Sequence, residues 1–183
     1  TLVNAPLVFA GYGISVSNDS VKYDDYAGVD VKGKLVIVLR YSPEGSKSGR
    51  FLSQTSVTTK VMIAREKGAA GIIFATAPPG TDGDALSSIK PPATAKAGMA
   101  AIAMTWQDVG GLLAAAGKDL KTLQSSIDST KLPASFELPG MSASLETQMI
   151  KEYGQSANIL GRLEGTDPAL ASELLVLGAH MDH

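Results

Sequence analysis

Cysteine is absent from this chain, which excludes disulfide bonds and thiolate zinc sites. Excess charge of one sign is also absent, because 16 Lys and Arg residues stand against 18 Asp and Glu residues and leave a formal net charge of -2 at pH 7. No basic run interleaved with aromatic residues occurs, which argues against a nucleic-acid partner. No apolar segment approaches the roughly 20 residues needed to cross a bilayer, so we expect no membrane span.

What is present is the composition of a soluble globular protein, with 44% apolar and 19% charged residues. The 183 residues suffice for one well-formed core, or for one domain and part of another. The chain begins at Thr1 without an initiating Met, and residues 1–6 lack the charged and apolar regions of a signal peptide. Together with the abrupt C-terminus, these features indicate a piece of a longer protein.

The first half of the chain predicts a strand–helix–strand unit. The run Leu35–Leu39 is aliphatic throughout and is typical of a buried strand. A helix capped by Thr55 or Ser56 should follow and run to about Lys67. Ala70–Phe74 has the pattern of a second buried strand, so the unit should be of the parallel βαβ kind.

Further elements are predicted on both sides of this unit. A change of pattern near Pro139 and Gly140 suggests a domain boundary there. Two long polar loops, Ser42–Gln54 and Ala77–Gly98, exceed the usual loop length and are candidate functional segments. The predicted strands are Leu7–Phe9, Ala101–Met104, Ser142–Ile150, Asn158–Leu163 and Leu174–Leu177, and the predicted helices are Thr105–Gly117 and Leu120–Asp128.

The strongest candidate site lies at the end of the apolar run Leu174–Leu177. His180 and Asp182 are two residues apart, so on an extended backbone both side chains leave from the same face. This spacing suits an imidazole bound to a metal and a carboxylate that orients it. His183 lies on the other face and is better interpreted as a supporting or structural residue.

Two parts of the chain resemble known families. Three segments are similar to a protease-associated (PA) domain, namely VFAGYGI (Val8–Ile14), YDDYAGVDVKGKLVIVL (Tyr23–Leu39) and AREKGAAGIIF (Ala64–Phe74). The last segment, SANILGRLEGTDPALASELLVLGAHMDH (Ser156–His183), resembles the opening of an M28 zinc aminopeptidase domain. In that family a G-(T/S)-D-P turn precedes a strand that ends in an H-x-D metal motif.

The resemblance implies an α/β fold in two parts. Residues 1–140 would form a PA domain of the swivelling β/β/α kind, with a β-sandwich or barrel-like core and flanking helices. Residues 141–183 would be the incomplete start of an M28 α/β domain. In that part Leu174–Leu177 would either pair with Ser156–Leu163 or stay unpaired.

The resemblance also implies a parent protein that is an extracellular or periplasmic zinc aminopeptidase. His180 would be a zinc ligand and Asp182 the residue that orients a ligand, while the remaining ligands and a Glu general base would lie downstream. Two zinc ions would polarise a scissile carbonyl and generate hydroxide to release N-terminal residues from peptides. Because zinc needs about four ligands, this chain alone should hold zinc weakly if at all and should be inactive.

The partners expected are peptide substrates and the rest of the protein's own peptidase domain. The PA part would cover the active site or modulate access to it, and its role as lid, specificity element or interaction module stays open. A second interpretation is a non-catalytic binding or dimerisation module of an M28-like ectodomain, and a third is a stand-alone peptide-binding PA domain. A Glu general base and a second zinc-ligand His in the downstream sequence would favour the aminopeptidase interpretation over the other two.

Several other motifs have simpler interpretations. Gly11-Tyr12-Gly13 lacks the rest of a phosphate-binding motif and predicts a tight turn. Asp24, Asp25 and Asp30 lack calcium-site spacing and are assigned to turns. Other residues are assigned on the same grounds: Asn18-Asp19-Ser20 as a chance glycosylation sequon, Trp106 as packing, and Lys60, Arg65 and Lys67 as a solvated helix face.

An unpaired apolar Leu174–Leu177 edge is a pairing hazard, so we expect self-association or disorder at the C-terminus. Light scattering should report oligomers, or hydrogen exchange should find these amides unprotected. A monodisperse monomer with these residues well protected would contradict the expectation.

Overall fold

The computed structural model describes residues 2–19, 21–45, 49–81, 83–86, 98–148, 155, 157–170 and 172–179. The chain divides into two units, Thr1–Met149 and Ile150–His183, which are described separately. The first unit holds every helix and strand of the described residues. Its strands are β1 (Leu2–Phe9), β2 (Ser15–Ser17), β3 (Lys22–Asp24), β4 (Leu35–Leu39), β5 (Gly71–Ala75), β6 (Ala100–Met104) and β7 (Phe136–Glu146). Its helices are η1 (Leu52–Gln54), α1 (Val57–Glu66), α3 (Trp106–Ala115) and α4 (Leu120–Thr130).

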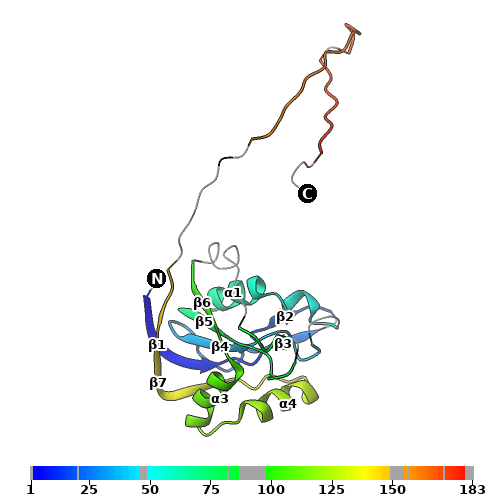
Figure 1. Ribbon diagram of the computed structural model, residues 1–183. Helices are drawn as coiled ribbons and strands as arrows, with labels where there is room; N and C mark the ends of the chain where they lie inside the picture. The colour runs from blue at the N-terminus through cyan, green and yellow to red at the C-terminus, as the bar shows by residue number, and fades with distance from the viewer. Residues whose placement is uncertain are drawn as a thin grey trace. The chain divides into compact units, whose positions relative to one another are not determined.

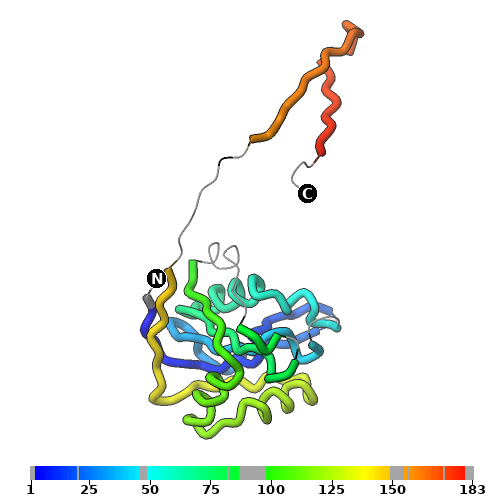
Figure 2. The backbone as a smooth tube through the Cα atoms, viewed as in Figure 1, coloured from blue at the N-terminus to red at the C-terminus, as the bar shows by residue number. Residues whose placement is uncertain are grey.

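Five strands form one mixed sheet in the order β6-β5-β4-β1-β7, and β2 pairs with β3 in a separate two-stranded sheet. The pairs β1–β4, β4–β5 and β5–β6 are parallel, which confirms the predicted βαβ unit. β7 joins the other edge antiparallel to β1. The first and last strands of this sheet therefore lie side by side, which Figure 2 shows in blue and yellow.

Helices cover both faces of the sheet (Figure 1). Leu35, Ile37 and Leu39 pack in one apolar cluster with α3 and α4, whereas Val36 and Val38 pack in a second cluster with α1. This alternation explains why β4 is buried along its whole length and why its sequence is aliphatic throughout. The parallel strands end at one edge of the sheet, where the loops of interest lie.

The helix boundaries follow from side-chain caps. Ser56 accepts a hydrogen bond from the Thr59 amide at the start of α1, and Thr105 does the same for Asp108 at the start of α3. Gly68 follows α1 with a φ of +87°, a value that favours glycine at this position. These caps confirm the predicted starts of both helices.

Two fold expectations need correction. The core is an open five-stranded sheet between helical layers, not a β-sandwich or barrel, because the short β2–β3 pair does not close it. β7 begins at Phe136 and pairs with β1 through Leu2↔Glu146, so residues 142–146 belong to the first unit's sheet and not to a second domain. Gly140, with a φ of +73°, lies within the strand. β7 thus runs through the predicted boundary at residue 140, and the two units of the chain divide after Met149.

The predicted strands Asn158–Leu163 and Leu174–Leu177 are not formed in the second unit. Both ranges lack regular secondary structure, and the side chains of Leu174–Leu177 are 82–89% exposed. Aliphatic strands of this kind need covered faces, and the described part of this unit supplies none. Within the described ranges, no helix is both long and apolar enough to span a membrane.

Candidate functional site: a buried polar centre beneath the loop edge

The carboxyl ends of β1 and β4 meet at one edge of the sheet, where open α/β folds place their binding loops. The chain leaves β1 through Gly11, Tyr12 and Gly13, and the Gly13 amide donates to the Ala10 carbonyl at 2.7 Å. This bond confirms the predicted tight turn. Beneath these loops, polar side chains from four parts of the sequence converge in a buried centre.

Asp25 is the acidic member of this centre and has no exposed surface. Its Oδ2 accepts the backbone N–H groups of Tyr12 and Ile14, both at 3.0 Å, and its Oδ1 accepts the Tyr23 hydroxyl at 2.9 Å. Gly11 approaches closely, since a Cβ there would lie 2.3 Å from Oδ1. Asp25 lies in the expected turn, where the Ala27 amide donates to the Asp24 carbonyl at 3.2 Å, but its carboxylate points into the core, which the sequence did not predict.

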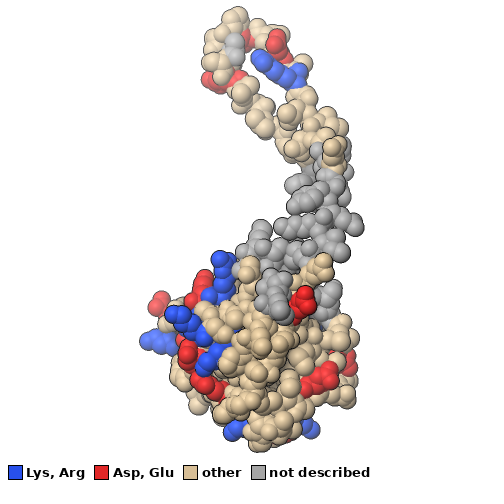
Figure 3. All heavy atoms as spheres, turned by 90° about the vertical axis from the view of Figure 1, so that its left-hand side faces the viewer, with Lys and Arg blue, Asp and Glu red and all other residues tan. Residues whose placement is uncertain are grey.

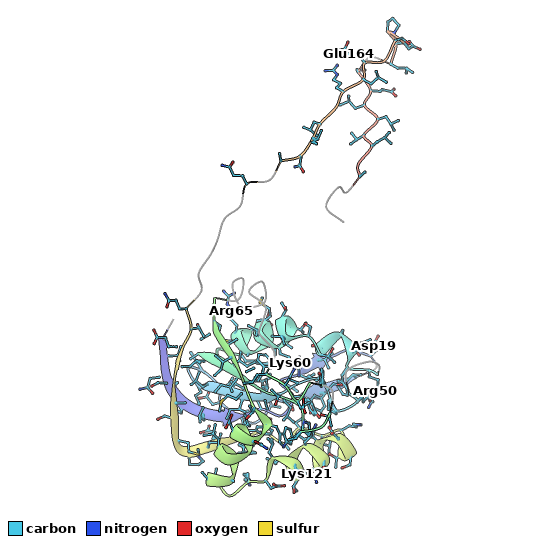
Figure 4. The ribbon with its side chains drawn as sticks, viewed as in Figure 1. Asp19, Arg50, Lys60, Arg65, Lys121 and Glu164 are labelled. Atoms are coloured by element: carbon cyan, nitrogen blue, oxygen red, sulfur yellow. The ribbon has the colours of Figure 1, made fainter. Side chains whose placement is uncertain are left out.

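Lys60 is the basic member and is 1% exposed. Its Nζ donates to three carbonyls, those of Tyr12 at 2.6 Å, Leu39 at 2.9 Å and Tyr41 at 2.6 Å. The prediction of a solvated helix face holds for the exposed Arg65 and Lys67 and was wrong for Lys60, which Figure 4 shows inside the domain. The reason is helical spacing, which puts Lys60 on the same face as Val61 and Ala64, both buried.

Tyr12 connects this pair to α4. Its hydroxyl donates to Asp128 Oδ1 at 2.6 Å and accepts from Gln124 Nε2 at 3.1 Å. Lys60 Nζ lies 5.4 Å from the centroid of the Tyr12 ring, within cation–π range. The centre therefore joins α1, α4 and the ends of β1, β3 and β4.

Burial dominates the electrostatics of the centre. It raises the pKa of Asp25 from 3.8 to about 7 against the opposing effect of its hydrogen bonds and of Lys60. It lowers the pKa of Lys60 from 10.5 to about 7, and the charge of Asp25 opposes that shift. Because neither group reaches the surface, no substrate can contact them in this conformation, and the arrangement holds loops in place.

The loop after β4 is the segment that this centre holds most directly. Tyr41 has a φ of +65°, a left-handed conformation that is uncommon for a residue with a side chain. Beyond it, the Glu44 carboxylate pairs with Arg50 at 2.8 Å, and Lys131, the residue that follows α4, donates to the Pro43 carbonyl. η1 ends the segment, which is therefore tied down at several points.

The described surface offers no metal site. No group of three or more His, Asp or Glu side chains that could hold a metal ion gathers among the described residues. On the face in Figure 3, acidic and basic side chains are interspersed. In the first unit Lys34 forms an ion pair with Glu137 and Lys67 forms one with Asp24, both at 2.9 Å.

The predicted site residues His180, Asp182 and His183 lie outside the described residues. The comparison with protein families concerns the first unit, where a model of the PA domain matches residues 3–134. The chain belongs to the PA domain family. PA domains are protease-associated accessory domains, and no curated protein matches the chain.

The sequence carried weak signals for the buried centre of this PA domain. Asp25 lies within the YDDYAG motif that supported the resemblance, yet the motif alone does not distinguish a buried carboxylate from a turn residue. Lys60 could have been found from its position on the apolar stripe of α1. Its three acceptors could not, because they are backbone carbonyls of residues distant in sequence.

Two buried tyrosines give a matched test of the centre, since Tyr23 and Tyr26 are each 5% exposed. The Tyr23 hydroxyl donates to Asp25, whereas the Tyr26 hydroxyl is buried without a hydrogen-bond partner among the described residues. Tyr23→Phe should lower the free energy of unfolding by about 2 kcal/mol in urea denaturation, because it removes a donor from a buried charge. Tyr26→Phe should leave it unchanged or raise it. A larger loss in Tyr26→Phe would contradict this account.

The raised pKa of Asp25 predicts a pH dependence of stability. Between pH 3.8 and about 7 the folded chain binds more protons at this carboxyl than the unfolded chain, so its contribution to stability is lost as pH rises through that window. Urea titrations should give the difference in free energy of unfolding, wild type minus Asp25→Asn, at several pH values. This difference should fall by about 1 kcal/mol for each pH unit as pH rises through the window. The exposed Asp19→Asn is the control, and a flat or rising difference for Asp25→Asn would refute the prediction.

Proposed function

We propose that this chain is the PA accessory domain, followed by the opening of the peptidase domain, of a secreted M28-type zinc aminopeptidase. The observation that carries the proposal is the order of the two parts in one chain. A PA domain over residues 3–134 precedes a Gly165-Thr166-Asp167-Pro168 turn, an apolar run and the His180-x-Asp182 pair. The PA family supports association with a protease, and the C-terminal motif supports the M28 type.

In this proposal His180 binds zinc through its imidazole and Asp182 orients the ligand set. Imidazole nitrogen and carboxylate oxygen are ligand types that zinc takes, so the donor chemistry fits the metal. The two residues supply fewer than the three protein ligands of a catalytic zinc site, and further ligands from the same protein would complete it. Bound zinc would polarise the scissile carbonyl and lower the pKa of a water molecule.

The PA domain would modulate which peptides reach that site. Loops on a rigid scaffold commonly carry binding function, and the loop edge above the buried centre carries the Tyr41–Gln54 segment. Leu52 of this segment is 48% exposed, as expected of a contact residue. The extracellular or periplasmic location belongs to the same proposal.

Activity of the full-length protein that contains this chain tests the proposal. Aminoacyl p-nitroanilides should be cleaved, chelation should abolish cleavage and added zinc should restore it. His180→Ala should reduce kcat/KM at least about 1,000-fold with loss of bound zinc, and Asp182→Asn about 10- to 100-fold. His183→Ala is the matched control and should stay within about threefold of wild type. A full-length protein that is folded, zinc-free and inactive would instead favour a non-catalytic binding or dimerisation module.

A further inference from the structure

The three hydrogen bonds of Lys60 have a consequence for the loop edge. An ammonium group has three N–H donors, and each is used by one carbonyl, so donors and acceptors match in number. A neutral amine has two donors and a lone pair. After loss of one proton, three carbonyl oxygens face two N–H groups and a lone pair. One of the three carbonyls therefore loses its hydrogen bond to Lys60.

The carbonyl that leaves most readily is that of Tyr41. The bonds from Lys60 to Tyr12 and Leu39 are buried, whereas the bond to Tyr41 is partly buried, so water reaches the Tyr41 carbonyl more readily than the other two. Tyr41 also holds a left-handed φ of +65°, a strained conformation for a residue with a side chain, which persists only where surrounding contacts impose it. Breaking this bond lets the backbone relax.

We propose that Lys60 is a proton-operated latch: its hydrogen bond to the Tyr41 carbonyl holds residues 41–45, at the start of the loop after β4, against the core, and loss of the Lys60 proton releases them. The bond to Leu39 keeps Lys60 tied to β4 after release, so the sheet stays intact. A further tie, from Lys131 at the C-terminal cap of α4 to the Pro43 carbonyl, limits how far residues 41–45 move.

The charged and polar groups around Lys60 affect which of its two protonation states is favoured. Asp25, beyond β3, favours the ammonium form of Lys60, while Arg40, beyond β4, disfavours it. Tyr12 presents its ring and its carbonyl to Lys60, and its hydroxyl is bound to Asp128 of α4. Burial lowers the pKa of Lys60 to about 7, which brings release into the neutral to alkaline range. The latch goes beyond the proposed peptidase function and does not depend on it.

Hydrogen exchange and a lysine titration on the same wild-type chain test the latch. Protection of the Glu44, Gly45 and Arg50 amides, corrected for intrinsic exchange, should fall about tenfold between pH 6 and pH 9, as expected for loss of one hydrogen bond. The Ile37 amide of β4 should stay protected. The ¹³Cε signal of Lys60 should titrate with the same midpoint as the loop amides. Midpoints more than about one pH unit apart, unchanged loop protection, or loss of protection in β4 at the same pH would overturn the proposal.

Variants separate the latch from general loosening. Lys60→Met should leave the loop amides weakly protected at every pH, with the pH dependence abolished. Lys121→Met removes an exposed lysine at the periphery of α4, shown in Figure 4, and should keep the wild-type profile. If Lys60→Met does not fold, the coincidence of the two wild-type midpoints still decides the question. Because none of these readouts is activity, failure of the latch is distinguishable from failure of the peptidase proposal.

Discussion

The fold depends on the burial of two ionisable side chains, the acid Asp25 and the base Lys60, beyond the carboxyl ends of β1 and β4. Burying either charge without partners would cost several kcal/mol, so each is surrounded by groups of matching polarity. Asp25 receives three donors, and Lys60 meets three carbonyl oxygens. These partners come from segments far apart in the sequence, so the centre is complete only when β1, β3, β4 and α1 are all in place.

This constraint bears on the domain's accessory role. The buried centre links the loop edge to both helical layers through Lys60 of α1 and Asp128 of α4. Apolar packing alone would set the distance between sheet and helices but not the direction of the loop backbones. Hydrogen bonds to the carbonyls of Tyr12 and Tyr41 supply that direction.

Local signals predicted much of the fold. Aliphatic runs located β4 and β5, and the Ser56 and Thr105 caps located the starts of α1 and α3, because both signals act within a few residues. β7 was misplaced for the opposite reason. Pro139 and Gly140 are typical of a boundary, yet the strand continues through them because β1 offers a free edge to pair with. Pairing between the two ends of a unit leaves no local trace in the sequence.

The functional interpretation likewise depends partly on local sequence signals and partly on contacts between distant residues. The sequence by itself determined the PA family, the βαβ unit and the H-x-D pair, since each follows from motifs in their order along the chain. Only the tertiary structure decided that Lys60 is buried among three carbonyls, that Asp25 is a core acceptor and that Tyr41 adopts a left-handed conformation. The physical reason is that a charged side chain is predicted to be solvated when only its neighbours in the sequence are considered. Its burial becomes favourable only when backbone groups distant in the sequence supply its hydrogen-bond partners.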